Sequence, residues 1–267
     1  MRRLLGYLKE TFRFPMPPER VHLSHEMLSA AIGDSWPSAE VSAAAELLAG
    51  GEGQFPSGIR SLPPDLVSAV QRERLLAAML RATAQLGYRE VNVQDVLDRA
   101  GVSRPTFYEH FENKEDCFLA AFDSAAGRLR KRLEGEFAEG GESWRPRLRT
   151  ALENLLRWVV EDPDAAMSLI VDARAACPAA LLRRDELLDH FASCIDTEVR
   201  AEASGEYPPS PIAAAGIVGG IEALLYSRIN KGETDDLESL LPSLMYFAVL
   251  PYEGHEAASE ELAGVAG

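Results

Sequence analysis

Apolar residues recur at helical spacing from Asp65 onward, and the breaks between these segments fall at glycine, proline or a capping polar residue. The spacing predicts helices over 65–86, 93–100, 104–111, 114–138, 143–160, 163–176, 179–203, 211–230 and 234–249. No segment alternates apolar and polar residues long enough to predict a strand. The pattern therefore predicts an all-α fold.

Two short predicted helices meet at the turn Ala100-Gly101-Val102-Ser103, which has the length of a helix-turn-helix. Asn92 and Ser103 are good N-caps for the two helices. In the second helix Phe107 and Phe111 are four residues apart and are expected to face the core. The remaining side chains of that helix then point outward, namely Arg104, Pro105, Thr106, Tyr108, Glu109 and His110.

The stretch from Gly87-Tyr88-Arg89 through Ser103-Arg104-Pro105-Thr106-Phe107-Tyr108-Glu109-His110-Phe111 to Asn113-Lys114-Glu115 resembles the DNA-binding domain of the tetracycline-repressor (TetR) family. The resemblance covers roughly residues 68–118, and the Tyr-x-His-Phe and Asn-Lys-Glu motifs are its specific part. The final apolar stretch, 244–252, also resembles the regulatory domain of the family, although helices of that domain diverge widely.

The resemblance implies that the second short helix enters the major groove of double-stranded DNA. Base-facing positions are then held by Arg104, Pro105 and Thr106, although Arg104 is equally suited to a phosphate. Phosphate contacts are implied for Tyr108, His110 and Lys114, and Gln94 stands where some members reach a base or a phosphate. The predicted DNA-binding set is Asn92, Gln94, Ser103, Arg104, Pro105, Thr106, Tyr108, His110 and Lys114.

The resemblance also implies a homodimer formed by the last two long helices, about 211–230 and 234–249. Small residues on one side of the first of these helices suit close helix packing. A pocket for a small hydrophobic effector is implied between the middle helices. Its candidate ligand-binding residues are Trp158, Met167, Asp172, Arg174, His190, Phe191 and Glu222.

These inferences divide the chain into four parts. Residues 1–64, rich in proline and glycine, are expected to form a mobile N-terminal extension. The helix-turn-helix DNA-binding domain is assigned to 65–118 and the helical regulatory and dimerisation domain to 119–252. Residues 253–267 are expected to form a flexible tail.

The formal net charge of -15 taken alone argues against nucleic-acid binding. The charge is distributed unevenly, because residues 71–120 carry 7 basic and 8 acidic side chains, whereas residues 121–267 carry 14 and 26. The acidity therefore lies outside the helix-turn-helix segment. DNA attraction is expected to come from a few placed donors rather than from a broad basic field.

Other classes find little support in the sequence. There is no Gly-rich phosphate loop, no His-Glu-x-x-His and no Gly-x-Ser-x-Gly, so neither enzymatic activity nor a cofactor is expected. No metal site is expected, and His22 and His25 beside Glu26 are only a weak hint of one. The odd number of distant cysteines and the absence of an apolar run long enough for a membrane span favour a soluble cytoplasmic protein.

The sequence thus predicts a transcriptional regulator, most simply a ligand-responsive repressor that binds a palindromic operator as a homodimer. The alternatives are a helical partner-binding module and a regulator that no longer responds to a small molecule. The identity of the operator and effector, and the choice between repression and activation, stay open at this point.

Overall fold

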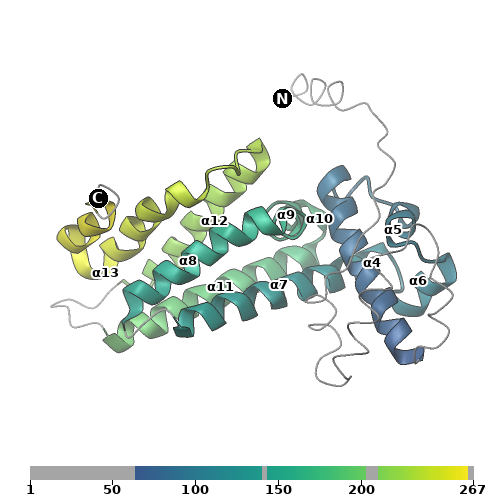
Figure 1. Cartoon of the computed structure of the whole chain (residues 1–267), viewed down its shortest axis with the longest axis horizontal. Helices are drawn as coiled ribbons and strands as arrows, with labels where there is room; N and C mark the ends of the chain where they lie inside the picture. The colour runs from purple at the N-terminus through teal and green to yellow at the C-terminus, as the bar shows by residue number, and fades with distance from the viewer. Residues whose placement is uncertain (1–63, 140–142, 203–209, 264–267) are drawn as a thin grey trace. The chain divides into compact units, whose positions relative to one another are not determined.

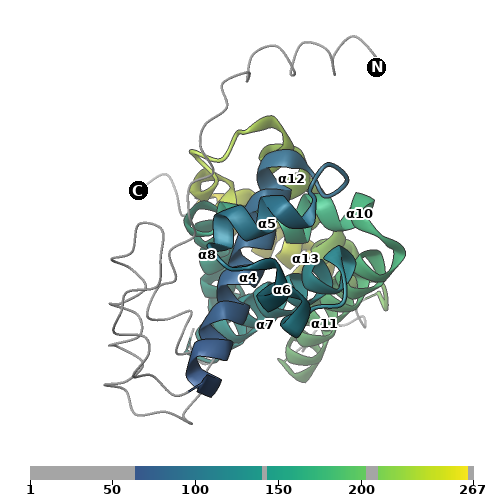
Figure 2. The ribbon, with the colours of Figure 1, turned by 90° about the vertical axis from the view of Figure 1, so that its right-hand side faces the viewer.

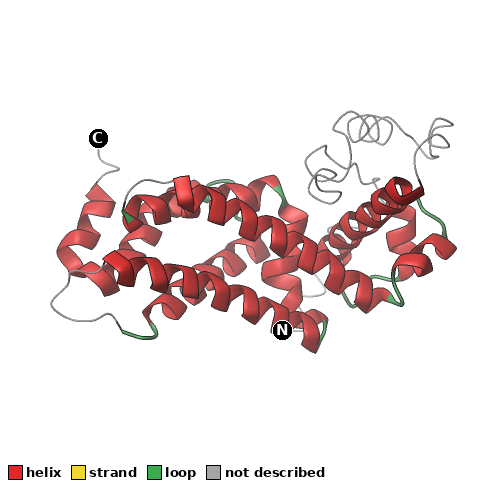
Figure 3. Ribbon diagram, turned by 90° about the horizontal axis from the view of Figure 1, so that it is seen from below, coloured by secondary structure: helices red, strands yellow, loops and turns green. Residues whose placement is uncertain are grey.

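The computed structural model describes residues 64–139, 143–202 and 210–263. All regular elements within these ranges are helices, as Figure 3 shows, which confirms the predicted all-α fold. None of the described helices combines the length and the apolar character that crossing a membrane requires. The predicted extension over residues 1–64 lies outside the described residues, except for Pro64.

The chain forms two compact units. Among the described residues, the first unit comprises 64–78 and 92–110, which include the start of α4 (Pro64–Leu86), all of α5 (Val93–Ala100) and all of α6 (Arg104–His110). Figure 2 presents α5 and α6 to the viewer. The apolar faces of α4, α5 and α6 are buried in this unit, as the spacing predicts. The buried residues include Val70, Leu75, Leu76, Val96, Leu97 and Phe107.

The second unit comprises residues 79–91 and the described residues from 111 onward. Its long helices are α7 (Lys114–Glu139), α8 (Trp144–Glu161), α11 (Pro178–Glu202) and α12 (Ala213–Lys231). In Figure 1, α7, α8 and α11 run side by side, and α12 packs against α11. Their buried faces form the core of the unit, which includes Phe118, Phe122, Leu129, Leu152, Leu156, Ile217 and Leu225.

The segment predicted as one helix over 163–176 is divided into three. A π-helical turn, η3 (Met167–Asp172), separates α9 (Pro163–Ala166) from α10 (Ala173–Ala176). Asp162 caps the start of α9 by accepting a hydrogen bond from the amide of Ala165 at 3.2 Å. Helical periodicity does not distinguish a π-turn from an α-turn, so the sequence gives no sign of it.

The last helix differs from its prediction at both ends. The short 3₁₀-helix η4 (Glu238–Leu240) precedes α13 (Leu241–Ala263), which is kinked at Gly254, where φ is 84°. The chain is therefore helical over 253–263, where the sequence predicts a flexible tail. Ion pairs hold this stretch, because Arg145 Nη2 lies 2.6 Å from Glu261 Oε1, and Arg149 also pairs with Glu261.

Candidate functional site

Reciprocal capping fixes the start of α5. The amide of Asn92 donates to Asp95 Oδ2 at 2.8 Å, and the amide of Asp95 donates to Asn92 Oδ1 at 3.2 Å. At the other end of the helix Gly101 has φ 65°, a left-handed conformation that glycine adopts without strain. The turn between α5 and α6 is thus set by local chemistry that the sequence already shows.

Helix α6 turns one side inward and leaves the other open. Phe107 is fully buried, whereas Arg104, Pro105 and Glu109 are exposed and Tyr108 is 52% exposed. The ring of Tyr108 packs edge-on against Phe107, with 5.4 Å between the ring centres, and this contact orients the phenol. The outward side chains form a surface suited to hydrogen bonding with another molecule.

A short chain of hydrogen bonds links α5 to α6. Arg104 Nη2 donates to Gln94 Oε1 at 3.0 Å, and Gln94 Nε2 donates to Asp98 Oδ1 at 2.7 Å. Ser103 Oγ accepts a hydrogen bond from the amide of Thr106 at 3.3 Å and so caps α6. Arg104 and Gln94, both predicted to touch DNA, are therefore held together.

His110 closes α6 and is partly buried. Its pKa lies below the ordinary value mainly because burial disfavours the imidazolium, and Arg72 lowers it further while Glu109 opposes the shift. At neutral pH the ring is therefore uncharged. A phosphate contact by His110 would be an ordinary N–H hydrogen bond rather than an ion pair.

Lys114, which belongs to the second unit, has a structural role that the sequence does not reveal. Its ammonium group donates to the carbonyl oxygens of Tyr88 at 2.9 Å and Val91 at 2.8 Å. It also lies 4.3 Å from the centre of the Tyr88 ring. Burial, the first cause, together with Cys177 and Glu115, raises the pKa of Tyr88 to about 12. Two of the three ammonium protons of Lys114 are thus engaged within the protein.

The second unit contains a partly open cavity of about 590 Å³ between α7, α8, η3, α11 and α12. This volume lies within the usual range for small-molecule sites. Its wall is mostly aliphatic and aromatic; representative lining residues are Leu129, Leu133, Leu148, Leu155, Leu188 and Phe191. The cavity therefore favours an apolar ligand.

Charged residues of the cavity wall form ion pairs near both ends of the lined part of α11, and between these ends His190 is paired with Glu134. Arg184 Nη2 is 2.8 Å from Glu222 Oε1, and Arg174 also pairs with Glu222. Fourteen residues further along α11, Glu198 lies 2.9 Å from Arg147. At about 1.5 Å per residue, the two positions on α11 are about 21 Å apart.

The structure separates the predicted ligand-binding residues into two groups. His190, Phe191 and Glu222 line the cavity, whereas Trp158, Met167, Asp172 and Arg174 are not among its lining residues. Arg174 stacks on the ring of Tyr226 at 4.3 Å. Seven leucines of α7, α8 and α11 also line the cavity, and their helical spacing is the signal that could have identified them.

Asp172 and Ser168 lie four residues apart in η3. Among the described residues, neither Asp172 Oδ2 nor Ser168 Oγ has a hydrogen-bond partner. Burial raises the pKa of Asp172 to about 7, because the carboxylate loses its water. This carboxyl group is therefore largely uncharged just below neutral pH.

One side of α12 is exposed and made of small residues; they are Ala215, Gly216, Gly219, Gly220 and Ala223. Phe247 of α13 covers Gly220 so closely that a Cβ atom there would lie 2.9 Å from its ring. Phe247 itself is 43% exposed. A Cβ at Gly216 or Gly219, in contrast, would meet nothing within 4 Å.

Comparisons with known proteins point to regulators of transcription. Residues 75–121 match the model of the bacterial regulatory proteins, tetR family. The chain is 27% identical to the uncharacterised HTH-type transcriptional regulator YdgC of Bacillus subtilis, over 67% of this chain and 93% of that protein. It is also 22% identical to the fatty acid metabolism regulator protein of Bacillus subtilis, over 46% of this chain and 63% of that protein.

Among solved structures, the chain resembles FadR from Bacillus subtilis in complex with stearoyl-CoA. The TM-score is 0.59 and the identity 21%, covering 67% of this chain and 97% of that one. At this identity the likeness concerns the fold. The two relatives from Bacillus subtilis are both named as regulators.

Proposed function

Because this chain is a transcriptional regulator with the helix-turn-helix domain of the tetR family, we propose that it is a homodimeric repressor that releases a palindromic operator when a hydrophobic effector occupies its cavity. The observation that carries the DNA part is the exposed face of α6 beside the Arg104–Gln94 hydrogen bond. A bidentate arginine on such a face reads guanine in the major groove.

The operator is tested by selecting bound duplexes from a random pool with the full-length protein. The expected result is a palindromic consensus, because a two-fold dimer presents two copies of α6. Arg104→Ala should relax the base preference at one position of each half-site, whereas Arg130→Ala, which changes an exposed arginine of α7, should not. Absence of enrichment would favour the partner-binding module instead.

The small-residue face of α12 supports the dimer. Because Gly216 has open space around its Cβ position within one chain, Gly216→Leu should be tolerated by a folded monomer. A leucine there obstructs a closely packed second copy, so the variant should be monomeric in sedimentation analysis. Gly135→Leu, at an equally open and exposed position on α7, is the control expected to stay dimeric.

We propose that the effector is a long-chain acyl compound. The apolar wall and the span of about 21 Å along α11 support an extended aliphatic chain. The names of two similar proteins, a fatty acid metabolism regulator and a complex with stearoyl-CoA, also favour an acyl effector for this protein. The charged pairs at the two ends of the cavity wall are candidate contacts for a polar head group.

The effector is tested by displacing a fluorescent fatty acid with palmitate or palmitoyl-CoA and with their short-chain counterparts. Long chains should compete and short chains should not. Leu188→Trp, which fills the cavity, should weaken binding by more than about tenfold. Leu182→Trp changes a leucine of the same helix that is 64% exposed, and should leave binding unchanged.

Operator binding is then measured with and without the effector that competes best. Release of the operator supports the repressor, because a ligand that prefers the low-affinity state weakens DNA binding by its differential affinity. Tighter operator binding would contradict release by the effector. No change at saturating ligand would identify a regulator that does not respond to this class of molecule.

A further inference from the structure

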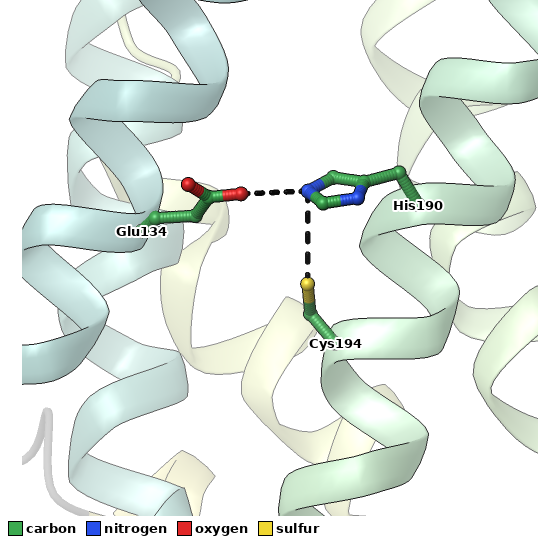
Figure 4. A group of neighbouring side chains, drawn as sticks. All are labelled: Glu134, His190 and Cys194. Carbon is green, nitrogen blue, oxygen red and sulfur yellow. Dashed lines mark hydrogen bonds and ion pairs between the residues drawn. The ribbon is translucent and has the colours of Figure 1, made fainter.

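Three side chains with metal-binding atoms converge on the wall of the cavity. Glu134 comes from α7, and His190 and Cys194 come from successive turns of α11 (Figure 4). His190 Nε2 lies 2.7 Å from Glu134 Oε1 and 3.8 Å from Cys194 Sγ. The candidate ligand atoms of the three residues all lie within 4.8 Å of one another.

The way in which His190 is used argues against a catalytic relay. In a nucleophile–histidine–acid relay, the acid and the nucleophile contact opposite nitrogens of the imidazole ring. Here the carboxylate and the thiol both face the same nitrogen, as Figure 4 shows. Burial and the carboxylates of Glu134 and Glu198 also raise the pKa of Cys194, so its thiol is a poor nucleophile.

Three ligand atoms that face one common point are instead typical of a metal site. We propose that Glu134, His190 and Cys194 bind a Zn²⁺ ion, with its fourth coordination position open to the cavity. Carboxylate, imidazole and thiolate are the three zinc ligands that proteins use, and three protein ligands with one open position are typical of zinc sites that bind a further molecule.

The distances fit this ion after small adjustments. Zinc–ligand bonds of about 2.0 to 2.3 Å in a tetrahedron place neighbouring ligand atoms about 3.3 to 3.6 Å apart. The pair distances of 2.7 and 3.8 Å bracket that range. The third pair, Glu134 and Cys194, lies within 4.8 Å, and the Glu134 side chain is 52% exposed, so it is free to move toward the other two ligands.

The proton balance is simple, and no redox partner is needed. Zinc takes the place of the Nε2 proton that His190 shares with Glu134, and the neutral ring then carries its proton on Nδ1 after exchange with water. Zinc also replaces the thiol proton of Cys194, which leaves as a hydrated proton. The imidazole binds in its neutral form and the carboxylate in its charged form. The ion then joins α7 to α11 across the cavity wall.

The sequence predicts no metal site because Glu134 precedes His190 by 56 residues. Only His190 and Cys194, at positions i and i+4 of one helix, have a recognisable spacing, and such a pair is common without a metal. The third ligand becomes visible only when α7 and α11 are placed side by side.

The test uses Co²⁺ as a spectroscopic substitute for zinc, added to the reduced, metal-free, full-length protein. The wild-type protein should develop a thiolate-to-cobalt charge-transfer band that Zn²⁺ abolishes by competition. Cys194→Ser should lose the band, and Glu134→Gln and His190→Gln should weaken cobalt binding by more than about 100-fold, a larger effect than removal of an outer-shell partner.

Two variants serve as controls. Cys177→Ser removes a partly exposed cysteine outside the cluster. His25→Gln removes one of the two neighbouring histidines, His22 and His25, near the start of the sequence. Both variants should keep the band. Circular dichroism of the metal-free variants establishes that they are folded. Absence of a band in the wild-type protein, or an equal band in folded Cys194→Ser, would overturn the proposal. Neither DNA nor acyl ligand enters this assay, so its outcome is independent of the proposed effector.

Discussion

The helix-turn-helix of the first unit and the helical cavity of the second differ in where they place their polar groups. Around α6 the interior is closed by Phe107 and the polar side chains point outward. Around the cavity the interior is open and mostly apolar, and its charged side chains are held in pairs, two of which lie near the ends of the lined part of α11. The first arrangement suits recognition of a surface, and the second suits enclosure of a small molecule.

This contrast extends to the amount of packing that each region retains. A fully packed helix-turn-helix holds its outward donors in fixed positions, which recognition of bases requires. The second unit leaves about 590 Å³ unfilled, so its wall side chains lack some of the contacts that a closed core provides. Stability is therefore expected to respond differently to mutation in the two regions.

The largest effect is expected from removing a packed ring. Phe107→Ala should lower the free energy of unfolding by about 3 to 5 kcal/mol, because Phe107 is completely buried and a cavity would remain. Phe191→Ala, at the cavity wall, should cost only about 1 kcal/mol. Urea denaturation of both variants measures the difference, and equal losses would refute the contrast in packing.

A smaller effect is expected at Lys114. Lys114→Ala removes two hydrogen bonds to carbonyl oxygens and should destabilise the protein by about 2 kcal/mol. Lys131→Ala, at an exposed position of α7, should be neutral. Thermal unfolding checks both variants. If Lys114→Ala lost DNA affinity at unchanged stability, the role of Lys114 would be phosphate binding alone.

A comparable, pH-dependent effect is expected at Asp172. Its pKa of about 7 lies above the value of 3.8 expected for an unfolded chain, so folding favours the protonated form. The contribution of the protonated Asp172 carboxyl group to stability is therefore complete below pH 3.8 and is lost as the pH rises through 7. A pKa of about 7 against 3.8 corresponds to at most about 4 kcal/mol above pH 7, so Asp172→Asn should stabilise the protein by at least about 1.5 kcal/mol near pH 8 and have little effect near pH 4. Denaturation at the two pH values measures it, and an equal effect at both would contradict the shift.

The smallest effect on folding is expected on the outward face of α6. Tyr108→Phe removes only an exposed hydroxyl, so stability should change by less than about 0.5 kcal/mol. Operator affinity should fall about fivefold to tenfold with the loss of one phosphate contact. Tyr226→Phe, in the second unit, is the control for DNA binding. Unchanged affinity of Tyr108→Phe in a filter or anisotropy assay would remove this residue from the interface.

The two regions also differ in how far the sequence predicts them. The caps at Asn92 and Gly101 and the inward spacing of Phe107 act within a few residues, so α5, the turn and α6 follow from local chemistry. The cavity wall joins residues as distant as Leu129 and Leu225, and no local signal encodes that contact. Long-range packing also explains why α13 continues to Ala263 where the sequence predicts a flexible tail, since Arg145 and Arg149 of α8 pair with Glu261.

The DNA-contacting and ligand-binding residue sets are still predictions, but the structure changes their physical meaning. Arg104 and Gln94 are now a hydrogen-bonded pair rather than independent contacts. Lys114 contributes to internal structure, which the resemblance did not indicate. Asp172 and Arg174 are not among the residues that line the cavity; Asp172 ends the π-turn of η3 and Arg174 follows it, in a segment that periodicity treats as one regular helix.

The ion pairs at Arg184 and Glu198 give the cavity a fixed length as well as a chemical character. An acyl chain shorter than the distance between the two ion pairs leaves part of the wall without contacts. A longer acyl chain has to break one of the ion pairs, which costs free energy because water is partly excluded from the charges. The cavity would then select ligands by the length of their acyl chain, with a sharp upper limit on that length. Moving one of the two ion pairs by one helical turn along α11 would change the longest accepted acyl chain by about 5.4 Å. Such variants would respond to ligands of different chain length.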